Sequence, residues 1–127
     1  MSLSGAHRAA FRREAPEEGR VYSIRDDRGI PVAKHTDGSR TLPFWSKASR
    51  ARKVVGQVPA YRKFDVVEIE LTDWRDRWLP GLEREGYLVG VNWAGPKATG
   101  YDVAPAQVAE WFADATSQAH SSVSPRP

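Results

Sequence analysis

The chain has 127 residues and a mass of 14.2 kDa, a size that suits one domain with short extensions. Cysteine is absent, which excludes disulfides, thiolate nucleophiles and cysteine-ligated zinc sites. No segment approaches the roughly 20 apolar residues of a membrane-spanning helix, and the N-terminus lacks the apolar stretch of a signal peptide. We therefore expect a soluble cytoplasmic protein with no membrane partner.

The net charge of +3 is unevenly distributed. Residues 1–63 hold 14 Lys/Arg against 6 Asp/Glu, whereas residues 64–127 hold 5 against 10. Such asymmetry indicates either a basic face for an acidic partner or two halves of one fold that attract each other. The second interpretation is slightly favoured.

The first half of the chain predicts one helix and several short strands. A helix over residues 4–14 should end near Pro16. Residues 20–25 alternate as a strand, and after a tight turn at residues 26–29 the chain should return as a partner strand over 30–33. Asp37-Gly38 predicts a second reversal before a strand over 41–45. Pro43 inside that strand favours an edge, or pairing on one side only.

A helix should follow to about Val55, with the hydroxyl of Ser46 as its N-cap. Residues 65–71 then alternate as a half-buried strand, with Val67, Ile69 and Leu71 on one face. Thr72 should cap the next helix, whose buried face carries Trp74, Trp78 and Leu82. Pro80-Gly81 should kink that helix or split it in two, and Gly86 should end it.

The last third predicts two strands and a final helix. Over 87–93, four large side chains alternate and should share one face: Tyr87, Val89, Val91 and Trp93. A short strand over 101–103 and a helix from Pro105, with Val108, Trp111 and Phe112 inward, complete the pattern. We expect an α+β single domain: a mainly antiparallel sheet of about four to five strands, with three to four helices largely on one face. The expected parts are a basic helix and linker (1–19), the domain (20–115) and a flexible polar tail (116–127).

No assembly of reactive residues is evident in the sequence. The three histidines, His7, His35 and His120, occupy a terminal segment, a turn and the tail, without metal-ligand spacing. The alternating Glu68 and Glu70 are typical of a solvated strand face rather than of an acid–base pair. We expect no catalytic residues, no metal and no cofactor, so the sequence leans away from an enzyme.

The aromatic residues suggest the leading function, a non-catalytic module that binds a protein or peptide. Trp45 and Trp93 end two predicted strands. If those ends are neighbours, the two rings form a recess with Asn92 and Arg25 as polar groups, a typical ligand site. Packing of both rings in the core is the more frequent outcome for tryptophan.

Two alternatives stay open. The basic helix over 47–53, with Lys47, Arg50, Arg52 and Lys53 beside Trp45, mixes cations and an aromatic ring as single-strand nucleic-acid binders do. An enzyme acting on a small polar substrate has less support, and requires a deep pocket where Arg25, Asn92 and a carboxylate converge.

Three segments are specific enough to suggest a family: PFWS (43–46), WLPGL (78–82) and VGVNW (89–93). With GYDVAP (100–105) and the helix that follows, they resemble the small bacterial proteins known as domain of unknown function 2750. The resemblance runs from about Val21 to Phe112. It implies a single α+β domain and a bacterial source, but no activity, cofactor or site residues.

Overall fold

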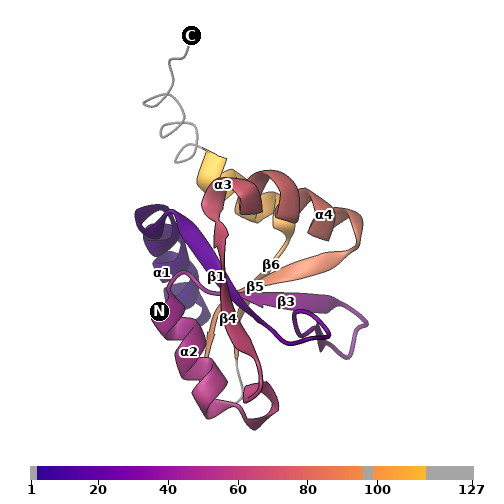
Figure 1. Cartoon of the computed structure of the whole chain (residues 1–127). Helices are drawn as coiled ribbons and strands as arrows, with labels where there is room; N and C mark the ends of the chain where they lie inside the picture. Colours follow the sequence, from indigo (N-terminus) through magenta and orange to yellow (C-terminus); the bar gives the residue numbers. More distant parts are fainter. Residues whose placement is uncertain (1–2, 96–98, 114–127) are drawn as a thin grey trace.

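The computed structural model describes residues 3–95 and 99–113 (Figure 1). The predicted tail, 116–127 with His120, lies outside the described residues. The elements in chain order are α1 (Leu3–Glu18), β1 (Arg20–Arg25), β2 (Ala33–Lys34), β3 (Arg40–Phe44), α2 (Ala48–Gln57), the 3-10 turn η1 (Pro59–Tyr61), β4 (Asp65–Glu70), α3 (Leu71–Asp73), the π-helical turn η2 (Trp74–Trp78), α4 (Leu79–Arg84), β5 (Tyr87–Ala94), β6 (Thr99–Val103) and a last helix over 105–113.

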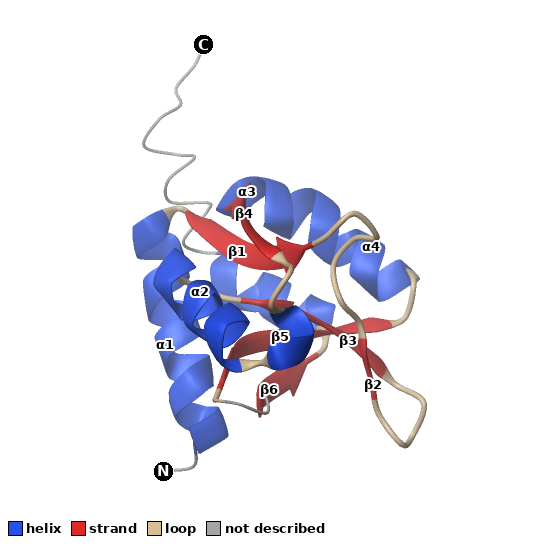
Figure 2. Cartoon of the chain, turned by 60° about the horizontal axis from the view of Figure 1, so that its bottom comes forward, coloured by secondary structure: helices blue, strands red, loops and turns tan. Residues whose placement is uncertain are grey.

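The strands form two sheets. β1 and β4 pair antiparallel as a two-stranded ribbon, and the second sheet has the order β2-β3-β5-β6. In that sheet β3 and β5 run parallel, while the pairs β2–β3 and β5–β6 are antiparallel. Figure 2 shows the ribbon set apart from the four-stranded sheet, with α1 and α2 beside both. The predicted α+β single-domain fold is confirmed.

One strand pairing differs from the prediction. The tight turn at residues 26–29 forms, with a bridge between Asp26 and Gly29, but the chain does not return along β1. The strand after the turn is β2, two residues long, and it pairs with β3. β1 pairs with β4 instead, Val21 opposite Ile69. Four of the six β1 residues are buried, so β1 needs cover on both faces, which a short local hairpin does not provide.

Two buried clusters lie on the two faces of β1. Val21 belongs to the larger cluster with Phe11, Phe44 and Trp74, whereas Tyr22 belongs to the smaller one under α2, with Ile24, Trp45, Ala51, Val54 and Trp93. α1 contributes Phe11 and Ala15, both fully buried. It continues past Pro16 to Glu18 rather than ending near residue 14, because the buried Ala15 keeps this turn packed on the core.

The helical segment after β4 also differs from the prediction. It begins at Leu71 and has no side-chain cap, so Thr72 does not act as one. The helix was expected to kink or split at Pro80-Gly81. It does not split, because the segment stays helical from residue 71 to 84, and the kink stays a prediction. The segment widens into η2, where the N–H of Leu79 bonds to the carbonyl of Trp74. A π turn of this kind absorbs a local change in bond register without a break. Trp74 and Leu82 are buried, as predicted.

A bulge near the end of β5 reverses the predicted orientation of Trp93. The register with β6 shifts between Val91 and Ala94, and Asn92 has a φ of 51°, in the left-handed region. A bulge adds one residue to one strand, which moves the following side chain to the other face. Trp93 therefore does not share a face with Val89 and Val91: it joins the cluster under α2 while they lie in the larger core.

Candidate binding groove

A groove of about 590 Å³ opens between the β1–β4 ribbon and the four-stranded sheet. Its lining comes from the end of β1, the turn after it, β3, β4, η2 and the start of β5. The residues are Arg25, Arg28, Gly29, Ile30, Val32, Leu42, Val67, Glu68, Ile69, Trp78 and Tyr87. The volume falls within the roughly 300–1,000 Å³ usual for ligand sites.

Pro43 accounts for the opening between the two sheets. β1 meets the chain at the end of β3 through a single bridge, in which Tyr22 and Trp45 exchange N–H···O bonds of 2.8 and 2.7 Å. The carbonyl of Pro43 accepts a 2.7 Å bond from the Ser23 hydroxyl. Because a strand residue's N–H and C=O point to the same side, the N–H that proline lacks would also face β1. Pairing of β1 with β3 therefore stops there. The prediction that the strand carrying Pro43 lies at an edge or pairs on one side only is wrong, because β3 lies between β2 and β5 and pairs with both.

The apolar floor of the groove is held in place by the core beneath it. Leu42 and Ile69 are buried members of the larger cluster, and Trp78 contacts Phe44 edge-on at 6.1 Å between ring centroids. The ring of Tyr87 is covered by the Arg40 guanidinium at 4.2 Å, a cation–π contact. Val32 is 40% exposed and is the large hydrophobic side chain left exposed among the described residues.

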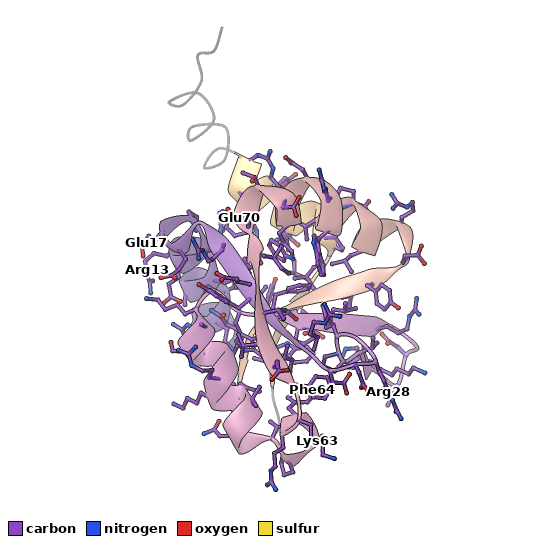
Figure 3. The ribbon with its side chains drawn as sticks, in the orientation of Figure 1. Arg13, Glu17, Arg28, Lys63, Phe64 and Glu70 are labelled. Carbon is purple, nitrogen blue, oxygen red and sulfur yellow. The ribbon has the colours of Figure 1, made fainter. Side chains whose placement is uncertain are left out.

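The rim of the groove is positively charged. Arg25 and Arg28 are both exposed, and neither forms an ion pair with another described residue. Glu68 also lines the groove, and its carboxylate accepts a 2.7 Å bond from Arg20. Figure 3 shows Arg28 on the opposite side of the molecule from Arg13 and Glu17 of α1.

Three of the four predicted binding residues lie together, but inside the protein. Trp45, Asn92 and Trp93 are no more than 5% exposed, and the indole N–H of Trp45 donates to the carbonyl of Trp93 at 2.8 Å. Arg25 lies apart from them in the groove. No recess lined by both tryptophans is present among the described residues, and their role in binding stays a prediction.

A buried polar network stands where Ser46 was expected to cap α2. The N-cap of α2 is Lys47, without a side-chain cap bond. The Ser46 hydroxyl donates to Glu14 at 2.7 Å, and the amide of Asn92 donates back to Ser46 at 2.9 Å. Glu14 also accepts two bonds from Arg50, at 2.8 and 2.7 Å. The N-cap prediction is wrong because a buried carboxylate needs donors more than an exposed helix start does.

This network sets the protonation of its members. The bonds from Arg50 lower the pKa of Glu14 most, those from Ser46 add to the effect, and burial opposes it. Glu14 is therefore ionised in the fold. His7 has its pKa lowered by burial and by the charge of Arg50, so its neutral form is favoured. Its buried Nδ1 has no hydrogen-bond partner in the described part of the chain.

Asp102 gathers a second polar group on the sheet. It accepts bonds from the Trp93 indole at 3.0 Å and from the Thr41 hydroxyl at 3.1 Å, and His35 Nε2 lies 3.0 Å from it. The Trp93 ring lies over Gly90, where an added Cβ would meet the ring at 2.4 Å. The bond from the Trp93 indole to Asp102 fixes the ring over Gly90. Within residues 3–95 and 99–113 no three metal-ligating side chains gather.

The four cations of the nucleic-acid alternative do not present one face. Arg50 turns inward to Glu14, and Lys47 lies 3.9 Å from Glu18. Arg52 and Lys53 are exposed. Half of the predicted basic set thus has a carboxylate partner, and binding of nucleic acid there stays a prediction.

Sequence reasoning missed the groove itself. The signal that could have revealed it is Pro43, which was interpreted only as a limit on strand pairing. Pro43 opens the groove only because β1 lies beside β3. The Ser23–Pro43 contact between these strands joins residues 20 apart in the sequence.

A comparison with protein-family models matches residues 8–112 to one described as "Protein of unknown function (DUF2750)". The chain belongs to this family. The match begins inside α1 and ends in the last helix, so α1 is part of the family's common region. A comparison with curated proteins gives no match. No helix among the described residues is long and apolar enough to span a membrane.

Proposed function

We propose that this DUF2750 protein is a non-catalytic module that binds a protein or peptide segment in the groove between its two sheets. The observation that supports this most is the apolar lining of the groove: the exposed Val32 and the partly buried Trp78 and Tyr87 line it above the buried Leu42 and Ile69. Exposed apolar surface next to a charged rim is characteristic of interaction sites.

The positions of the polar groups also favour binding over catalysis. The Glu14 carboxylate is buried and accepts bonds from Ser46 and Arg50, and Asp102 accepts bonds from Thr41 and Trp93. Among the described residues that line the groove, Glu68 is the one acidic residue, and its carboxylate is already paired with Arg20. A reaction would need an acid or base free to reach a substrate.

The test is a selection of phage-displayed random dodecapeptides on the full-length protein, followed by titration of the ¹⁵N-labelled protein with the enriched peptides. Amide shifts should concentrate at residues 25–32 and 67–69 and at Leu42, because these surround the groove. Failure to enrich any peptide, or shifts confined to α1 and α2, would refute the proposal.

A further inference from the structure

The groove is lined by two chemically different kinds of residue. Arg25 and Arg28 stand at the end of β1 and on the turn that follows, whereas Trp78 and Tyr87 come from η2 and the start of β5. A ligand that contacts both kinds of residue must be amphiphilic.

The two arginines are exposed. In the turn that follows β1, the Asp26 carboxylate accepts the backbone N–H of Arg28 at 2.9 Å. Asp26, Asp27 and Asp65 line an adjacent, smaller hollow of about 370 Å³, with Lys63 and Arg25. Arg28 lines the groove but not that hollow, and it forms no ion pair with another described residue. Guanidinium groups bind carboxylates through paired N–H···O bonds.

We infer that the groove takes an extended peptide segment with an acidic residue beside Arg25 and Arg28 and bulky apolar side chains against Trp78 and Tyr87. This inference rests on the proposed function and specifies its ligand. An extended chain rises about 3.3 Å per residue with alternate side chains on one face, so two apolar residues that alternate along it reach the floor together. The basic rim then selects the orientation, and the apolar floor supplies most of the affinity.

The experiment uses the peptides enriched on the wild-type protein. Acidic residues should be enriched beside paired apolar residues, and replacing Asp or Glu by Asn or Gln in a synthetic peptide should weaken binding roughly three- to tenfold. The double variant R25Q/R28Q should bind the acidic and amide peptides equally. K53Q, which removes an exposed cation on α2, should retain the preference of the wild-type protein.

The outcomes separate the inference from the proposed function. If acidic and amide peptides bind the wild-type groove equally, the inference is wrong while the proposed function stands. If no peptide binds, or if binding maps outside the groove, both are wrong. An oligothymidylate that binds with the same dependence on Arg25 and Arg28 would also overturn the inference, because it would show that the rim selects polyanions. Circular dichroism checks that the variants are folded, which is expected because both arginines are exposed.

Discussion

Replacing Glu14 by Gln should destabilise the protein by roughly 2 kcal/mol near neutral pH. Glu14 is 6% exposed and accepts three short bonds, from Ser46 at 2.7 Å and from Arg50 at 2.8 and 2.7 Å. Glutamine keeps the shape, but its NH₂ group must face a donor. Bonds to a charged group contribute about 1.5–3 kcal/mol each. The expected loss of stability in E14Q is near the lower end of this range because the Arg50 side chain is 38% exposed and water can solvate it.

The pH dependence of this effect has a defined sign. The pKa of Glu14 is lowered in the fold, chiefly by Arg50, from an ordinary value of 4.5. Its ionisation therefore stabilises the fold fully above pH 4.5, and this contribution is lost as pH falls through the lowered pKa. The gap between wild type and E14Q in urea-unfolding free energy should be largest near neutrality and shrink in acid.

The matched control is E17Q, on the same helix but exposed, which should change stability by less than about 0.5 kcal/mol. An E14Q protein as stable as wild type near neutrality, or a gap that does not shrink in acid, would refute the account of this network.

Two further predictions concern Gly90, which the Trp93 ring covers, and His7. G90A should lower the free energy of unfolding by roughly 1–3 kcal/mol, because the new methyl would meet the Trp93 ring at 2.4 Å. G56A, with open space around the added methyl, should not be destabilised by overpacking. Equal stability of the two variants would contradict this packing of Trp93 on Gly90. The pKa of His7 is lowered from 6.5 by burial and by Arg50, so the unfolded chain takes up its proton first and wild-type stability should fall as pH drops below 6.5. H7Q should lose less stability over that interval, and identical pH profiles would disprove the assignment.

The local elements were predictable because they depend on neighbouring residues. The alternation of Val67, Ile69 and Leu71 identified β4, and Pro105 marked the start of the last helix. Helix starts were less predictable: Ser46 resembles a cap locally, and only the approach of Glu14, 32 residues away, gives its hydroxyl another use.

Long-range pairing could not be derived from the same patterns. The parallel alignment of β3 with β5 has no local sequence signal, because it depends on how β4 and the helices between the two strands pack. The bulge at Asn92 likewise reverses Trp93 without interrupting the alternating pattern of the strand. The groove depends on a local feature, the N–H that Pro43 lacks, and on a long-range one, the packing of β1 beside β3. Its residues were therefore not predicted as a set.

The most direct test of groove binding is a change at Val32, which is 40% exposed and can be replaced without disturbing the core. In calorimetric titrations with a selected acidic peptide, V32K and V32E should both bind more weakly than wild type because apolar contact is lost. V32E should be the weaker of the two, because it adds a negative charge to a groove that binds an acidic ligand, and K53E on α2 should bind as wild type does. Unchanged affinity in both Val32 variants would contradict the assignment of this groove as the binding site.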